Sequence, residues 1–109
     1  MALVGKTNEE RIWNFLKSKG LNDFGAAGLM GNLNAESCLR PNNLEDSYQG
    51  KLGMTDESYT AAVDNGSYSN FANDCAGYGL AQWTYRTRKA ALLVFAQACG
   101  ASIGDLEMQ

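Results

Sequence analysis

Residues 26–41 read AAGLMGNLNAESCLRP, and this stretch predicts a helix that ends by presenting a carboxylate. On a helix, Leu29, Leu33 and Glu36 fall at positions i, i+4 and i+7, so the acid continues an apolar stripe. Two glycines in the stretch destabilise a solvated helix by roughly 1 kcal/mol each, which indicates that a neighbouring backbone approaches them closely. Pro41 stops the helix, because the residue before a proline avoids the helical conformation. An acid on a buried stripe is either a functional group or half of a structural ion pair.

The length and composition of the chain are those of one globular domain. Its 109 residues suffice for a single modest core, and 45% apolar with 19% charged residues are typical of soluble proteins. No apolar run reaches the ~18 residues of a membrane span, and the N-terminal residues lack the apolar core of a signal peptide. The net charge of −3 and the absence of a basic run argue against nucleic acid as the main partner.

The residue types that are present limit the chemistry of the chain. Histidine is absent, which excludes Ser-His-Asp and Cys-His catalysis and any histidine-containing metal site. Cys38, Cys75 and Cys99 are odd in number and widely spaced, so they fit neither a disulfide scaffold nor a zinc motif, and we expect buried free thiols. We therefore expect no metal and no cofactor. The chemistry must come from carboxylates, amides, hydroxyls and aromatic rings.

Capping signals predict two helices in the first third of the chain. Thr7 followed by Glu10 is a capping box, and it predicts a helix that runs to about Lys19. Asn22 or Asp23 then caps a second helix, which ends at the acid of the stretch quoted above.

A third helix is predicted over residues 85–99, with Thr84 as its N-cap and Gly100 just past its end. Its first turns carry three basic residues that oppose the helix dipole, namely Arg86, Arg88 and Lys89. These residues are either solvated or bound to an anionic partner. Residues 102–109 begin a fourth helix without a C-terminal signal. Either this helix is very short, or the chain is a truncated version of something longer or a module of a larger protein, which is the alternative we expect.

Residues 41–76 form a polar segment in which the apolar periodicity disappears. Within it, residues 44–54 are expected to be a loop with short strand character, and residues 58–63 are either one helical turn or a short strand. The sequence DNGS at residues 64–67 is a turn signal that favours a small hairpin. A polar segment of this length in a compact domain is more often a functional loop than a core element.

Two motifs, GNLNAES at residues 31–37 and GYGLAQWT at residues 77–84, resemble the phage tail lysozyme family. These peptidoglycan hydrolases are similar to goose-type lysozymes and lytic transglycosylases. In that wider group a catalytic Glu followed by Ser ends a helix, as Glu36 and Ser37 do in this sequence. A later G-L-M-Q motif lines the same cleft, and residues 79–82 match it with Ala in place of Met.

The resemblance covers about residues 8–109, nearly the whole chain. It implies that residues 1–109 form a single lysozyme-like domain, mostly α-helical (α+β), with a small loop or β-hairpin lobe. The helices that usually follow in the family are missing, so we expect a C-terminally truncated member whose cleft is incomplete or is completed by another chain.

The resemblance also implies a general acid. Glycosidic bond cleavage needs one protonated carboxyl group, and an apolar helical stripe disfavours the charged form of a carboxylate and raises its pKa. Glu36 has that setting and the matching motif, and we expect it to be the acid. Asp74 is the candidate second catalytic group, because similar goose-type lysozymes carry an Asp shortly before their glycine-rich motif. The alternative for Asp74 is a side chain that caps a turn.

Five side chains in or directly after the two motifs are expected to bind substrate, namely Ser37, Tyr78, Gln82, Trp83 and Tyr85. Gln82 is expected either to hydrogen-bond an N-acetyl group or a water, or to satisfy the backbone. The three aromatic residues offer flat faces for sugar rings, with core packing as the alternative, above all for Trp83.

The function that the resemblance implies is cleavage of the β-1,4 bond between N-acetylmuramic acid (MurNAc) and N-acetylglucosamine (GlcNAc) in peptidoglycan. One alternative is a lytic transglycosylase with the same acid, and another is a non-catalytic peptidoglycan-binding or phage-tail structural module. The expected partners are glycan strands of the bacterial wall and other domains of a larger tail or wall-hydrolase protein. The expected location is the virion tail or the cell wall after release.

Overall fold

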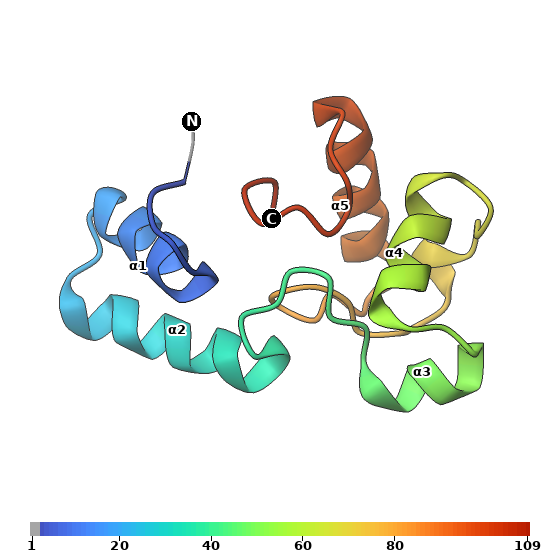
Figure 1. Ribbon diagram of the computed structural model, residues 1–109, viewed down its shortest axis with the longest axis horizontal. Helices are drawn as coiled ribbons and strands as arrows, with labels where there is room; N and C mark the ends of the chain where they lie inside the picture. The colour runs from blue at the N-terminus through green and yellow to red at the C-terminus, as the bar shows by residue number, and fades with distance from the viewer. Residues whose placement is uncertain (1–2) are drawn as a thin grey trace.

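The computed structural model describes residues 3–109 and shows two groups of helices (Figure 1). They are joined by a central segment that consists of two stretches of the chain, residues 38–45 and 74–85. Helices α1 and α2 form one end of the molecule, and α3, α4 and α5 form the other. The helices are α1 (Asn8–Ser18), α2 (Asp23–Ser37), α3 (Asp46–Leu52), α4 (Asp56–Asp64) and α5 (Arg86–Cys99), with a 3-10 turn, η1 (Phe71–Asn73). The fold is therefore mostly α-helical, as the sequence predicts.

The α1–α2 pair follows the predicted caps. The Thr7 side chain accepts the backbone N–H of Glu10, and the Asn22 side chain accepts the N–H of Gly25 at 2.8 Å. The two helices bury a common apolar cluster that also receives Leu80 from the central segment, and its buried members are Ile12, Leu16, Ala26, Met30 and Leu80. This cluster is the core of the N-terminal end.

The face of α2 that turns inward differs from the predicted stripe. It is spaced at i, i+4, i+7 and i+11 and consists of Ala26, Met30, Leu33 and Ser37. Leu29 and Glu36 are exposed, because at 3.6 residues per turn they lie roughly 70–90° around the helix from the middle of that face. The predicted close approach at the glycines is also wrong, since a Cβ at Gly28 or Gly31 would meet nothing within 4 Å.

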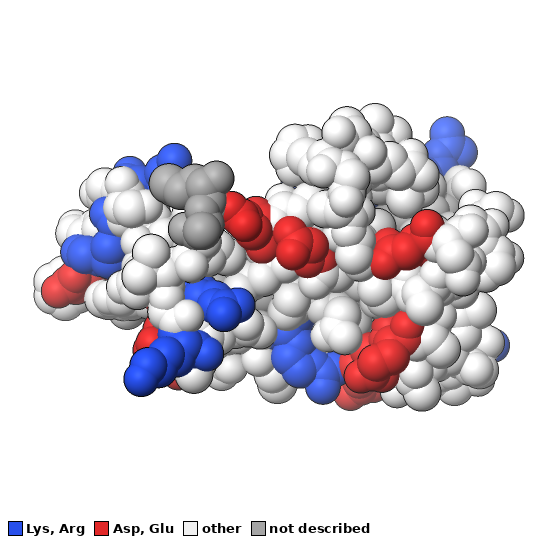
Figure 2. All heavy atoms as spheres, turned by 45° about the horizontal axis from the view of Figure 1, so that its top comes forward, with Lys and Arg blue, Asp and Glu red and all other residues white. Residues whose placement is uncertain are grey.

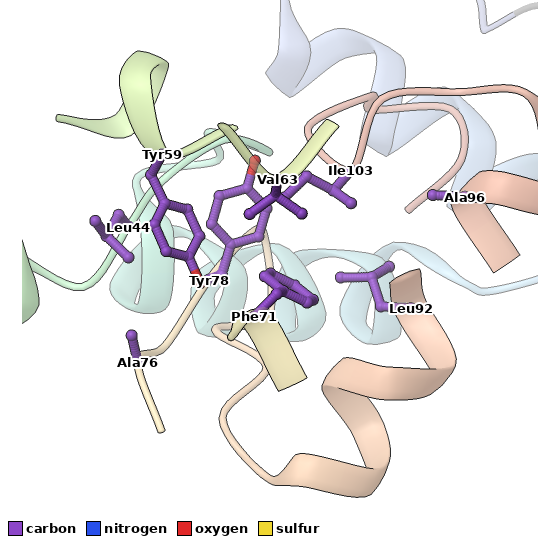
Figure 3. Packing of buried hydrophobic residues seen from close by; sticks show 9 residues of the cluster. All are labelled: Leu44, Tyr59, Val63, Phe71, Ala76, Tyr78, Leu92, Ala96 and Ile103. Atoms are coloured by element: carbon purple, nitrogen blue, oxygen red, sulfur yellow. The ribbon is translucent and has the colours of Figure 1, made fainter. Parts of the chain in front are cut away.

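The larger core lies at the other end of the molecule (Figure 3). Three aromatic rings form its centre: Tyr59 from α4, Phe71 from η1 and Tyr78 from the central segment. Their centroids are 5.4–6.0 Å apart, and all three side chains are buried. Aliphatic residues from α4, α5 and the C-terminal segment surround the rings, namely Val63, Leu92, Ala96 and Ile103.

The predicted β-hairpin is not present among residues 3–109, where β structure consists of two isolated bridges, Leu44 to Tyr78 and Tyr78 to Trp83. The ambiguous residues 58–63 are helical, because Thr55 and Ser58 form a capping box that starts α4. The DNGS sequence ends that helix instead of joining two strands.

The helix predicted at the C-terminal end does not form, and residues 103–108 make turns instead. The Ser102 hydroxyl donates to Asp64 at 2.5 Å rather than capping a helix. The Gln109 side chain folds back onto the central segment, where its Oε1 accepts the N–H of Leu80 at 2.9 Å and its Nε2 donates to the carbonyl of Pro41 at 2.6 Å. These bonds connect the C-terminal segment to α4 and to the central segment.

The surface carries charges of both signs. Figure 2 shows Lys and Arg side chains of one face mainly on the end that carries α1, and Asp and Glu side chains mainly over the middle and toward the end that carries α3 and α4. Within the described part of the chain, no helix is both long and apolar enough to cross a membrane.

Candidate active site

The C-terminal end of α2 presents Glu36 to solvent. The helix stops at Cys38, which adopts a left-handed conformation (φ 54°) and whose N–H donates to the carbonyl of Asn34 at 2.8 Å. The Glu36 side chain is exposed, and its carboxylate makes no hydrogen bond or ion pair within residues 3–109. The burial predicted for Glu36 is therefore wrong, but its carboxylate is free to meet a ligand.

Backbone strain is found directly after the first motif, inside the second motif and next to Asp74. Within residues 3–109, the non-glycine residues with positive φ are Cys38, Leu39, Cys75 and Gln82. Each such residue costs on the order of 1–3 kcal/mol, and strain of this kind gathers at functional sites where the surrounding structure maintains it. The first two directly follow Glu36-Ser37, and Gln82 is the last residue of the G-L-A-Q sequence. This distribution supports a functional role for both motifs.

The GYGLAQWT motif forms a tight turn. The backbones of Tyr78 and Trp83 pair in both directions, with N···O distances of 3.1 and 2.8 Å, and the N–H of Gln82 donates to the carbonyl of Gly79 at 3.2 Å. Leu80 at the tip of the turn packs in the α1–α2 cluster, whereas Tyr78 packs in the larger core. The turn therefore holds the two ends of the molecule together.

A carboxylate that the sequence analysis did not single out contacts this motif. Glu45 is half-buried, and its Oε1 accepts the N–H of Gly77 at 3.0 Å while its own N–H donates to the Gly77 carbonyl at 2.7 Å. The Ser47 hydroxyl donates to the other carboxylate oxygen at 2.6 Å. Since 32 residues separate Glu45 from Gly77, no local pattern could have indicated this contact.

Asp74 lies in the interior and has a structural environment. Its side chain is 2% exposed and forms an ion pair with Lys89, whose side chain is fully buried. The hydroxyls of Tyr59 and Tyr68 donate to its Oδ2 at 2.6 and 2.8 Å, and the N–H of Ala76 donates to its Oδ1 at 3.0 Å. With both oxygens occupied and little surface exposed, Asp74 cannot reach a glycan, and we do not retain it as a catalytic group.

This buried pair shows why one of the basic residues in the first turns of α5 is not solvated. Of the two alternatives, solvation or an anionic partner, Lys89 has the anionic partner, which is Asp74. Its ammonium group also donates a hydrogen bond to the carbonyl of Ala76 at 2.8 Å. Burial lowers the pKa of Lys89, and the hydrogen bond and charge of Asp74 oppose that shift.

The remaining candidates separate into buried and exposed groups. Ser37 is buried and donates to the carbonyl of Leu33 at 3.0 Å, and Tyr78 is fully buried with its hydroxyl 2.6 Å from that of Thr60. Neither side chain is placed to contact a sugar. Tyr85, by contrast, is 74% exposed just before α5.

Trp83 and Gln82 occupy intermediate positions. Trp83 is partly buried against both core clusters. The side-chain amide of Gln82 satisfies the backbone, because its Nε2 donates to the carbonyls of Asn43 and Gly79 at 2.9 and 3.0 Å. The three cysteines are free, as predicted, but all are exposed and not buried.

A hollow of about 660 Å³ lies between the two groups of helices. Asn8 of α1 and Thr60 of α4 line it from opposite ends, together with Asn42 and residues of the C-terminal segment. Glu36 is not among the residues that line this hollow. The candidate site therefore combines an exposed, unpaired acid at a strained helix end with a turn that packs against both cores.

Comparison with known proteins agrees with these motifs. The phage tail lysozyme family matches residues 7–109, which is nearly the whole chain and close to the range over which the motifs predict resemblance. No curated protein and no solved structure matches the chain. Because the family match covers far more than half of the sequence, the chain belongs to the phage tail lysozyme family.

Proposed function

We propose that this chain is a glycosidase that cleaves the β-1,4 bond between MurNAc and GlcNAc, with Glu36 as the general acid. Membership of the family implies a lysozyme-like peptidoglycan hydrolase. The observation that carries the assignment to Glu36 is its position: an exposed, unpaired carboxylate at the end of α2, followed by two left-handed residues. The Glu-Ser motif supports the same residue.

The chemistry requires that Glu36 be protonated when the bond breaks. Its proton passes to O4 of the GlcNAc unit as the bond from C1 of MurNAc to that oxygen breaks. A glycan lying over Glu36 removes the carboxylate from water, and this favours the neutral form that the reaction needs. In this proposal the bound substrate, and not the packing of α2, shields the Glu36 carboxylate from water.

The exposed aromatic and amide groups are the proposed sugar contacts. Tyr85 has a free ring face, and the partly buried Trp83 and the amide oxygen of Gln82 lie in the turn that precedes it. The buried Ser37 and Tyr78 are proposed to maintain the shape of the site instead. The proposed partners are the glycan strands of bacterial peptidoglycan, with further domains of a tail or wall-hydrolase protein, at the virion tail or the cell wall.

A lytic transglycosylase is the second candidate, and the burial of Asp74 favours it. A transglycosylase needs one protein acid, because the substrate's own N-acetyl and 6-hydroxyl groups complete the reaction. Removal of Asp74 from the catalytic groups leaves Glu36 without the second carboxylate that the sequence predicts.

Product analysis separates these functions. Purified peptidoglycan is digested with the chain, and the released muropeptides are examined by mass spectrometry. Hydrolysis yields MurNAc with a reducing end, whereas transglycosylation yields 1,6-anhydro-MurNAc. Retention of the chain on insoluble peptidoglycan without release of sugar would contradict both enzymatic functions and indicate a binding module.

A further inference from the structure

Two side-chain oxygens meet above Gly77, the first residue of the GYGLAQWT motif. A Cβ built on Gly77 would lie 2.8 Å from Oε1 of Gln82 and 2.9 Å from Oε1 of Glu45. The hydroxyl of Thr84 would lie 3.4 Å from the same point. One face of this glycine is therefore crowded by three oxygen atoms from the motif and from Glu45.

The orientation of both side chains is set by hydrogen bonds. The Nε2 of Gln82 is held by two backbone carbonyls, so its Oε1 is the end that faces Gly77. The Glu45 carboxylate is held from one side by the N–H of Gly77 and from the other by the Ser47 hydroxyl. Each oxygen has two or more lone pairs, so each can accept a further hydrogen bond.

Both of these oxygens are acceptors, so a group that binds between them must be a donor. Water and sugar hydroxyls satisfy that requirement, and an anion does not. Glu45 is half-buried, in contrast to Asp74 and Asp56, which are buried in ion pairs with Lys89 and Arg40. Of these three acids, Glu45 has both a direct bond to the motif and access to solvent.

We propose that Glu45 is the general base of the hydrolysis and that it holds the attacking water together with the amide oxygen of Gln82. The inference rests on the proposed function. The water oxygen bonds to C1 of MurNAc while one water proton passes to the Glu45 carboxylate. The C1–O4 bond breaks, and O4 of GlcNAc receives the proton of Glu36. Direct attack by water inverts the configuration at C1, so the first product carries an α-anomeric MurNAc.

The test compares Glu45→Gln with Asp46→Asn. The amide at position 45 can still accept the N–H of Gly77, so we expect the fold to be preserved, but the amide cannot take a proton. We expect kcat to fall by at least about 100-fold with KM unchanged. Asp46→Asn removes the same charge from the adjacent exposed residue, and this variant retains the activity of the parent chain.

A second measurement needs no variant. Proton NMR of the parent chain's reaction shows the anomer that forms first, and the proposal requires the α form. A β product, a 1,6-anhydro product, or an undiminished kcat in Glu45→Gln would overturn the inference. If Glu36→Gln is inactive in those cases, the proposed acid stands while the base is wrong. If the parent chain releases no sugar, both proposals fail.

Discussion

The ammonium group of Lys89 contacts the carboxylate of Asp74 in the interior, where the two side chains are 0% and 2% exposed. Both groups are also hydrogen-bonded to neighbours, Lys89 to the Ala76 carbonyl and Asp74 to two tyrosine hydroxyls. A buried ion pair of this kind is stable only when the remaining donors and acceptors are satisfied. The pair thus connects α5 to the segment that leads into the GYGLAQWT turn.

Removal of one partner of the Lys89–Asp74 ion pair should lower the free energy of unfolding. Lys89→Met leaves the Asp74 carboxylate buried without its cation, and we expect the free energy of unfolding to fall by ~3–5 kcal/mol. Urea denaturation measures the change. Arg88→Met, one residue earlier on the exposed surface, is the control and should stay within ~0.5 kcal/mol of the parent chain. Equal stabilities for the two variants would show that the ion pair contributes nothing.

Two buried tyrosines and one half-buried tyrosine predict a loss of stability at alkaline pH. Burial and the hydrogen bond to Asp74 raise the pKa of Tyr68 to about 12, and burial above all raises the pKa of Tyr59 and of Tyr78 well above the usual 10.0. Above pH 10 the unfolded chain therefore loses protons that the folded chain keeps, and the folded state loses stability as pH rises, by up to ~1.4 kcal/mol per pH unit for each tyrosine.

Lys89 has the opposite effect on stability at pH values below 10.5, its usual pKa. Because the pKa of Lys89 is lowered in the folded chain, the folded chain releases this proton at a lower pH than the unfolded chain, and stability rises with pH over that range. We therefore expect the decline to become steep above pH 10.5. Urea midpoints between pH 8 and 12, read with tyrosinate absorbance, measure it. Tyr78→Phe should make the decline shallower and Tyr85→Phe should not, since Tyr85 is exposed. A stability that is constant up to pH 12 would contradict the burial of these hydroxyls.

Gly77→Ala should affect activity more than stability. The backbone of Gly77 lies outside the left-handed region, so alanine is allowed there, and its Cβ would displace the hydrogen-bonded ends of the Glu45 and Gln82 side chains. We expect a cost of about 1 kcal/mol in unfolding free energy and a loss on the order of 100-fold in kcat/KM.

The matched control for this variant is Gly28→Ala. A Cβ there meets nothing within 4 Å on an exposed helix, so the substitution should raise stability by ~1 kcal/mol and leave turnover unchanged. Full activity in Gly77→Ala would show that the positions of the two displaced oxygens do not matter for the reaction.

The helices with local signals could be predicted from sequence, and the packing of α2 could not. Thr7 and Asn22 cap their helices through bonds to residues three positions ahead, and such bonds depend only on neighbouring residues. Apolar and small residues surround α2 on every side, so the spacing of Leu29, Leu33 and Glu36 was one of several stripes that the sequence allows. Contact with α1 selects the stripe through Met30 instead.

The environments of the acidic residues also depend on tertiary contacts that the local sequence does not predict. Asp74 and Glu45 are both polar residues in a loop-rich segment, and their sequence neighbours do not distinguish a buried acid from an accessible one. Their environments are determined by Lys89 and Gly77, which are 15 and 32 residues away. The motifs therefore predict the region of the candidate site, and the tertiary contacts distinguish the buried carboxylate of Asp74 from the more accessible one of Glu45.

Glu36→Gln is the decisive variant for the proposed general acid. The substitution keeps the size and exposure of the side chain but removes its proton, so we expect release of reducing MurNAc ends from purified peptidoglycan to fall by at least about 100-fold, with binding to the insoluble wall unchanged. Glu57→Gln, an exposed acid on α4, is the control and should digest like the parent chain. Digestion by Glu36→Gln at the rate of the parent chain would contradict the account.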